Sequence, residues 1–253
     1  MKKTIMVFFS VLLFLAVSIL PAQAGRIVVT NDEWTLSDYG FSQSSTQPGT
    51  FALNVANWFS GSTGNFLVDS DNFGLTGTSL STLMTGNGYG WTVTTNSSPS
   101  LPYLQQFNAV FLAGYAVNNA TLIAYVNGGG NIFLEGGTGE TNEATTWNTF
   151  LNAFGLSYAS GYNGIQGDIP ISSTHPIFTG VSSLYEDNGS DITDIAPSDP
   201  RSQVLITYGT NGLYAVYDSL IATVPATVPE PTTMLLLGLG LIGVAGLRRK
   251  MHK

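Results

Sequence analysis

Residues 107–137 read FNAVFLAGYAVNNATLIAYVNGGGNIFLEGG, and this stretch decides the fold that the sequence predicts. Strands are expected at 109–113 and 131–135, with apolar runs at 110–113 and 132–134, and they flank a segment that is expected to be a helix. Asn118 or Asn119 can cap that helix at its start, and the glycines at 128–130 end it. The apolar runs show no alternation with polar residues, which is typical of strands that are buried on both faces.

The same alternation of strand and helix extends outward from this stretch, over residues 26–154. Strands are expected at 26–30, 65–68 and 92–95, and helices at 50–59, 75–84 and 145–154, with Gly155 as the stop of the last helix. This order predicts an α/β domain with a parallel sheet flanked by helices on both faces. The C-terminal part is more β-rich, with a hairpin expected from 203–208 and 213–217. The abundance of Gly, Ser, Thr and Asn keeps an all-β sandwich as the alternative.

The N-terminus has the three parts of a secretory signal peptide. Lys2 and Lys3 precede an apolar run over residues 5–20, and a small-x-small site ends at Ala24. Cleavage is therefore expected between Ala24 and Gly25, which makes residues 1–24 the signal peptide. A permanent N-terminal membrane helix is the alternative.

The C-terminus combines a proline-rich segment, an apolar run and a basic end. The apolar run 232–247 rises about 24 Å as a helix, slightly short of a bilayer core of about 30 Å. Flanking residues and local thinning can cover this difference. The basic cluster that follows places this end in the cytoplasm by the positive-inside rule. We therefore expect a transmembrane helix at 232–247, preceded by a linker at 223–228.

This terminal pattern resembles the PEP-CTERM sorting signal of Gram-negative bacteria that make exopolysaccharide. The resemblance covers residues 228–250 and implies processing by exosortase, a membrane enzyme that cuts near the proline-glutamate-proline motif. It also implies a precursor in the inner membrane and a mature form in the periplasm, at the cell surface or in the extracellular matrix. An ordinary C-terminal anchor is the alternative. The residues that carry the sorting motif are Val228, Pro229, Glu230, Pro231, Arg248 and Arg249.

The intervening domain, residues 25–222, is strongly acidic and has no cysteine. Its two basic residues, Arg26 and Arg201, stand against fifteen acidic ones, which gives a formal charge of −13. Nucleic-acid binding is excluded because no basic patch can neutralise phosphates. Without cysteine there are no disulfides, thiolate metal sites or thiol nucleophiles.

Part of this domain resembles the class I glutamine amidotransferase-like, flavodoxin-like superfamily. The segments that carry the resemblance are 107–114, the following helix, 128–137 and the His-Pro-Ile-Phe-Thr-Gly-Val run at 175–181. It implies a flavodoxin-like parallel sheet. The amidotransferase nucleophile is a cysteine after the central strand, where this chain reads Leu-Glu-Gly-Gly-Thr-Gly at 134–139. Amidotransferase activity is therefore not carried over.

Other catalytic residues were considered in the same region. Thr138 lies at the position of the nucleophile elbow, between Glu135 and Glu140, and His175 is the one histidine of the domain. A triad requires the base within hydrogen-bond reach of the nucleophile, which sequence does not establish. His175 before Pro176 is the more typical pattern of a turn residue. No catalytic residue is therefore predicted.

Two acidic turns and several aromatic residues are candidate ligand sites. The turns at 69–74 and 186–191 alternate oxygen ligands as calcium sites do, but neither is a complete calcium loop. They are expected to be solvated, with a structural calcium as the alternative and no other cofactor or metal. Flat rings with nearby Asn or Asp side chains are typical of sugar-binding clefts. The rings considered are Trp34, Tyr39, Phe41, Trp58, Tyr158, Tyr162 and Tyr185, with Trp58 assigned to the core.

Together these patterns predict an exported, non-enzymatic surface or matrix protein associated with exopolysaccharide. Its expected partners are signal peptidase, exosortase, the inner membrane before processing, and exopolysaccharide. The alternatives are a glycan-binding module or degenerate hydrolase-like domain, and a true hydrolase that uses His175.

Overall fold

The computed structural model describes residues 25–96, 98–139 and 143–221. The predicted signal peptide, linker and sorting signal, including the predicted membrane span at 232–247, lie outside these ranges. Within them, no helix is both long enough and apolar enough to cross a membrane.

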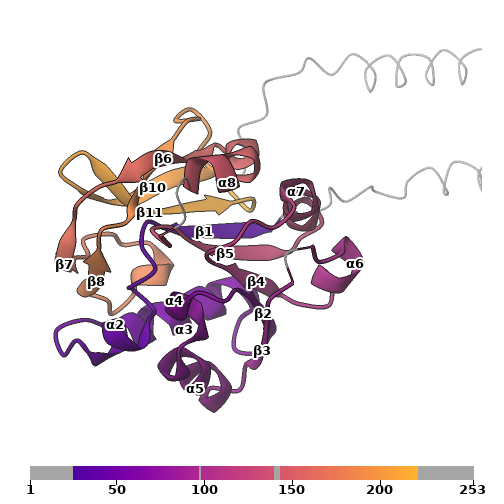
Figure 1. The fold of residues 1–253 in the computed structure, drawn as a ribbon, viewed down its shortest axis with the longest axis horizontal. Coiled ribbons are helices and arrows are strands. Elements are labelled where there is room, and N and C mark those ends of the chain that lie inside the picture. The colour runs from indigo at the N-terminus through magenta and orange to yellow at the C-terminus, as the bar shows by residue number, and fades with distance from the viewer. Residues whose placement is uncertain (1–24, 97, 140–142, 222–253) are drawn as a thin grey trace, which may run out of the picture. The chain divides into compact units, whose positions relative to one another are not determined.

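A seven-stranded sheet runs through the centre of the described domain, with strand order β10-β11-β1-β5-β4-β2-β3 (Figure 1). Five neighbouring strands are parallel, and β11 joins β1 in antiparallel register. The prediction of an α/β fold with a mainly parallel sheet is confirmed, and the all-β alternative is excluded. The strands are β1 (Arg26–Thr30), β2 (Asn65–Asp69), β3 (Gly90–Thr94), β4 (Ala109–Leu112), β5 (Asn131–Glu135), β10 (Ser202–Tyr208) and β11 (Asn211–Asp218).

Helices cover both faces of the sheet (Figure 1). One face packs against α3 (Pro48–Ser60) and α5 (Thr78–Gly86), and the other packs against α7 (Asn119–Asn127) and α8 (Glu143–Leu151). The short helices are α2 (Asp38–Ser42), α4 (Phe73–Thr76) and α6 (Leu101–Leu104). The β-rich C-terminal part adds two small antiparallel sheets, formed by β6 (Leu156–Tyr162) with β9 (Ser190–Asp194) and by β7 (Gln166–Pro170) with β8 (Ser183–Asp187).

The central strands alternate between two apolar cores. In β5, Phe133 enters the core on the α3 side, while Ile132 and Leu134 enter the core on the α7 side. Because both faces of each strand are covered, the middle positions of β5 are all apolar, which explains the unbroken apolar run at 132–134.

One predicted helix, 75–84, is divided in two by Gly77, whose backbone is extended (φ −61°, ψ 155°). The Asp38 carboxylate reaches this break and accepts hydrogen bonds from the backbone N–H of Thr78 (3.2 Å) and of Ser79 (2.7 Å). A carboxylate from another segment thus caps the start of α5, a contact that local periodicity does not reveal.

Phe111 tests the core on the α3 side. Its ring lies 5.0 Å from the rings of Trp91 and Phe133, centroid to centroid. We expect Phe111→Ala to lower the free energy of unfolding by about 3–5 kcal/mol, because it leaves a cavity in a closely packed core. Urea denaturation followed by circular dichroism measures this. Val93→Ala, at a side chain that is 50 % exposed on β3, is the control and should change stability by less than about 0.5 kcal/mol. Equal losses in both variants would contradict the packing described here.

Candidate functional site

Five acidic residues gather at the carboxyl ends of β1 and β5, and we refer to them as the acid cluster. Two directly follow β1, one ends β5, one opens α8 and one belongs to β8. None of their side chains is more than 7 % exposed. The acid cluster consists of Asp32, Glu33, Glu135, Glu143 and Glu186.

Asp32 and Glu33 are held by neighbouring loops. Asp32 accepts hydrogen bonds from the backbone N–H of Trp34, at 3.0 Å, and from that of Asp187. Glu33 accepts one from the side-chain amide of Asn72. Both acidic turns of the sequence therefore adjoin the acid cluster, one through Asn72 and the other through Asp187 and Glu186.

Glu186 is buried within a network of neutral donors. Its Oε1 accepts hydrogen bonds from the Tyr214 hydroxyl and from the Thr35 hydroxyl, the latter at 3.4 Å. The Thr35 and Tyr214 hydroxyl oxygens are themselves 3.1 Å apart. This network ties β8 to β11 and to the loop after β1.

Glu135 is the unusual member of the acid cluster. Its side chain is wholly buried, and neither carboxyl oxygen has a hydrogen-bond partner among the described residues. Its Oε2 faces Gly74, where a Cβ atom would stand only 2.6 Å from that oxygen. Gly74 therefore makes room for the carboxyl group, and an alanine there would collide with it.

Burial raises the pKa of four carboxyl groups of the acid cluster. It raises the pKa of Asp32 to about 6 and that of Glu33 to about 7. For Glu135 and Glu186 burial raises the pKa well above the ordinary range, and repulsion from neighbouring acids adds to the effect. Arg26 and Arg201 pair instead with Asp218 (3.1 Å) and Asp199 (2.6 Å). Among the described residues, the acid cluster is therefore stabilised by protonation and by neutral hydrogen-bond donors rather than by a basic side chain.

The residues considered for a catalytic triad are not brought together. Thr138 follows the carboxyl end of β5, and its hydroxyl donates a 2.6 Å hydrogen bond to Glu143. His175 contacts the Trp58 ring, at 5.2 Å between centroids, and Trp58 stacks against Arg26 at the amino end of β1. Since β1 and β5 are parallel, Thr138 and His175 lie at opposite edges of the sheet. The interpretation of His175 as a turn residue is confirmed, because its Nδ1 accepts the Ile177 N–H at 3.4 Å.

The acidic turns also have local roles. Asn72 caps α4 by accepting the Gly74 N–H at 2.7 Å, and Asp69 accepts the Tyr115 hydroxyl at 2.5 Å. In the described ranges, no three histidine, cysteine or acidic side chains are grouped so that they could hold a metal ion. The turns were predicted to be solvated, and this is wrong for Asp69 and Glu186, which are buried. A structural calcium at these turns stays an untested alternative.

Four aromatic rings form a surface cluster next to the acid cluster. Trp34 lies 5.5 Å from Tyr39 and 4.8 Å from Phe73, and Tyr39 lies 5.1 Å from Tyr185, centroid to centroid. Tyr39 is 49 % exposed and Phe73 43 % exposed. We call Trp34, Tyr39, Phe73 and Tyr185 the aromatic patch. Trp34, Tyr39 and Tyr185 were candidates in the sequence, but Phe73 was not, because nothing in its local sequence indicates that its ring is exposed.

The other rings considered for sugar binding lie elsewhere. Tyr158 is buried, and its hydroxyl donates to the Thr30 carbonyl at 2.7 Å. Phe41 and Trp58 pack against the core on the α3 side, which agrees with the assignment of Trp58 to the core. Tyr162 is exposed on β6, outside the aromatic patch.

Comparison with known families identifies the PEP-CTERM protein-sorting motif at residues 227–250. No curated protein and no solved structure matches the chain. The motif marks the chain as an exported, exosortase-processed protein. The amidotransferase-like resemblance gains no support from these comparisons. The parallel strands also follow the order β3-β2-β4-β5-β1 rather than the 2-1-3-4-5 order of a flavodoxin-like sheet, because β1 lies beyond β5.

The residues of the predicted sorting motif fall within the matched range but outside the described residues. The predicted cleavage between Ala24 and Gly25 also stays a prediction, and Gly25 is the one residue of that pair that the structure describes.

The acid cluster makes stability depend on pH. The folded domain keeps protons that the unfolded chain releases above the ordinary carboxyl pKa values of 3.8 and 4.5. The free energy of unfolding should therefore fall as pH rises from about 4, through the pKa of about 6 for Asp32 and about 7 for Glu33. Glutamine does not ionise, so the Glu135→Gln variant lacks the pH-dependent cost of this carboxyl group. The free energy of unfolding of the variant, relative to that of wild type, should therefore rise by on the order of 1.4 kcal/mol per pH unit. Urea titrations between pH 5 and pH 8 measure this.

Asp38→Asn is the matched control. Asp38 is exposed, and hydrogen bonds from Ser79 and Thr78 lower its pKa. Its contribution to stability is therefore complete above pH 4, and the difference between Asp38→Asn and wild type should stay constant from pH 5 to pH 8. A Glu135→Gln difference that is equally constant would contradict the account of the acid cluster.

Proposed function

We propose that the chain is the precursor of a surface or extracellular-matrix protein whose mature domain associates with exopolysaccharide in a non-catalytic role. The sorting motif at 227–250 carries this proposal. In this scheme signal peptidase removes residues 1–24, and the apolar run 232–247 holds the precursor in the inner membrane. Exosortase then cuts at or near 228–231, and the mature domain reaches the periplasm, the cell surface or the matrix.

The chemistry of the domain supports a non-catalytic role. The absence of cysteine removes thiol nucleophiles. Thr138 and His175 lie at opposite edges of the sheet, so they do not form the nucleophile–base pair that covalent hydrolysis requires. The carboxyl groups of the acid cluster are buried, which keeps them from a polymeric substrate in this conformation.

The aromatic patch favours a second candidate function, glycan binding. Exposed rings beside polar side chains suit the flat apolar faces of sugar rings. Tyr39 and Phe73 present such faces to solvent, and Trp34 lies against both. The patch would give the domain a direct contact with exopolysaccharide. A degenerate hydrolase-like ancestry is compatible with this role.

Sorting can be tested by replacing Pro229, Glu230 and Pro231 with alanine. We expect the variant to accumulate as an uncleaved, membrane-bound chain, because it lacks the motif at which exosortase is proposed to cut. The measurement is the C-terminal mass of the protein in membrane, periplasmic and medium fractions of the native host. Pro225→Ala, outside the matched range, is the control and should mature normally. Normal maturation of the triple variant would refute processing at this motif.

Glycan binding can be tested by retention of the mature protein on exopolysaccharide from the same host. Trp34→Ala and Tyr39→Ala should each weaken retention by about 2- to 10-fold, the range expected for loss of one aromatic contact. Tyr208→Ala is the matched control, because this ring is equally exposed on β10, away from the aromatic patch. If all three variants bind as wild type does, the aromatic patch is not the binding surface. Thermal midpoints of the variants show whether any loss reflects unfolding.

A further inference from the structure

Gly25 occupies a buried slot at the amino edge of the sheet. Its backbone nitrogen lies 2.6 Å from the carbonyl oxygen of Val126, to which it donates a hydrogen bond. Val126 belongs to the last turn of α7, and its carbonyl oxygen also accepts the Gly129 N–H at 3.0 Å, so the Gly25 N–H is a second donor to the same oxygen. The next residue, Arg26, donates its N–H to Asn131 at 2.9 Å and begins β1. The backbone N–H groups of Gly25 and Arg26 are therefore both hydrogen-bonded at the start of the described domain.

Only glycine fits this slot. A Cβ atom on Gly25 would overlap the carbonyl oxygen of Gly130 and stand 2.5 Å from its carbonyl carbon. Gly130 has no room to retreat, since a Cβ atom at Gly130 would itself overlap the Tyr125 ring. The Tyr125 hydroxyl in turn donates to the Phe107 carbonyl at 2.9 Å. The Gly130 carbonyl group therefore closes the slot, and the Tyr125 ring keeps Gly130 in place.

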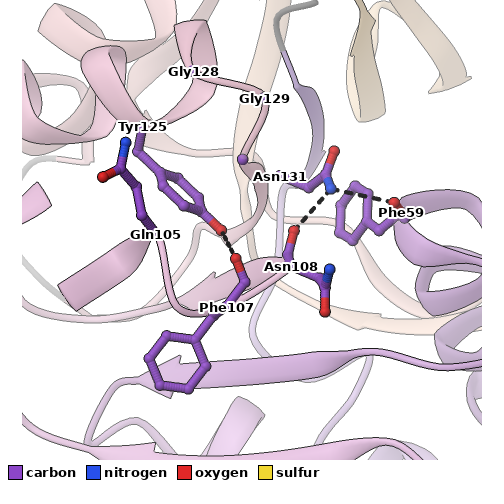
Figure 2. Close-up of a pocket in the computed structure, with 9 residues that line it drawn as sticks. Phe59, Gln105, Phe107, Asn108, Tyr125, Gly128, Gly129 and Asn131 are labelled. Carbon is purple, nitrogen blue, oxygen red and sulfur yellow. Dashed lines mark hydrogen bonds between the residues drawn. The ribbon is translucent and has the colours of Figure 1, made fainter. Parts of the chain in front are cut away.

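A hollow of about 260 Å³ adjoins the slot. It is lined by the Gly128–Gly129–Gly130 loop, by Tyr125 and by the polar side chains of Gln105 and Asn131 (Figure 2). Figure 2 shows Tyr125 bonded to the Phe107 carbonyl, and Asn131 bonded to the carbonyls of Asn108 and Phe59. A hollow of this size and polarity has room for several water molecules beside the loop that holds Gly25.

We propose that this slot is a binding site for the protein's own N-terminal ammonium group. Cleavage between Ala24 and Gly25, which the proposed function requires, converts the amide nitrogen of Gly25 into an ammonium with three donors. One donor keeps the contact with Val126, and water in the hollow satisfies the others. The ammonium lies at the C-terminal end of α7, where the helix dipole favours a positive charge. Removal of the signal peptide thus adds a positive charge that caps the C-terminal end of α7 in the folded domain.

The charges around the slot are compatible with this. From α7 the nearest titratable group is Tyr125, whose pKa is raised by burial, so it stays neutral. Along the sheet, Arg26 is paired with Asp218, its partner on β11. His175 lies beyond Arg26, and burial lowers its pKa. From β5 the slot meets Asn131, which is neutral. The ammonium therefore meets no uncompensated cation among these neighbours, within a domain of formal charge −13.

The sequence offers a direct test, because residues 25–222 contain no lysine. In the mature protein the Gly25 amine is then the one primary amine, so amine-acetylating reagents report on it alone. The experiment purifies the exported protein from its native host and measures the acetylation rate by mass spectrometry between pH 7 and pH 9. A peptide of residues 25–29 serves as the unstructured reference. We expect acetylation of the protein at pH 8 to be at least about 10-fold slower, because a docked ammonium loses its proton less readily.

Acetylation should also lower the thermal midpoint of the protein at pH 7, because the cap loses its charge. At pH 10 the acetylated and free forms should melt alike, since the free amine is then neutral. Acetylation at the peptide rate with an unchanged midpoint would overturn the proposal. A mature chain that begins elsewhere than Gly25 would overturn it too. Retention of Lys250 and Lys253 would be visible as extra acetylated amines and would count against the sorting proposal. The acetylation rate of the Gly25 amine could still be measured in that case.

Gly25→Ala provides a second measurement. Its methyl group should expel the terminus from the slot, and acetylation should then approach the peptide rate. Gly86→Ala is the matched control, because a Cβ atom there meets nothing within 4 Å. It should acetylate as wild type does. If Gly25→Ala fails to fold, the acetylation and melting of the wild-type protein still decide the question.

Discussion

The pairing of β1 on both sides is the constraint on which the rest of the domain depends. On one side β1 pairs in parallel with β5, and on the other it pairs in antiparallel register with β11. The first pairing joins it to the α/β half of the chain, and the second joins it to the hairpin near residue 210. β1 is five residues long and mostly buried, so its two ends lie at the amino ends and at the carboxyl ends of the parallel strands. Both regions of chemical interest lie at these ends.

The two edges differ in charge. At the amino edge lie Gly25 and Arg26, next to the end of α7 and the Trp58 ring. At the carboxyl edge lies the acid cluster, where Asp32 and Glu33 leave β1 beside Glu135. The parallel strands run from the end that holds the Arg26–Asp218 ion pair to the end that holds the acid cluster. With only two basic residues in the domain, both paired at surface positions, the acid cluster depends on hydroxyl, amide and proton donors. Its network is therefore sensitive to pH in a way that an ordinary salt bridge is not.

Sequence patterns predicted the elements better than their contacts. The apolar runs of β4 and of the middle of β5 indicated buried parallel strands, because strands that are covered on both faces have unbroken apolar runs. The hairpin of β10 and β11 was expected, but its pairing with β1 was not, since nothing local to either strand specifies a partner almost 200 residues away. Gly77 divides a predicted helix because Asp38, some 40 residues earlier, caps the second half. Each miss comes from a long-range contact rather than from a misjudged propensity.

The candidate site shows the same division. The sequence indicated Glu135 only as a neighbour of the candidate nucleophile Thr138, and the two acidic turns only as loops. These features are spread from residue 69 to residue 191, so nothing in the sequence connects them. The fold brings parts of all three to one place, which no spacing rule detects. Buried carboxyl groups without basic partners are unfavourable, and apolar side chains of similar volume often stabilise a core better. A domain selected for bulk and solubility alone would have no reason to keep Glu135 buried against Gly74. The acid cluster is therefore the part of the domain that stability does not explain, and the aromatic patch beside it gives that region an exposed surface.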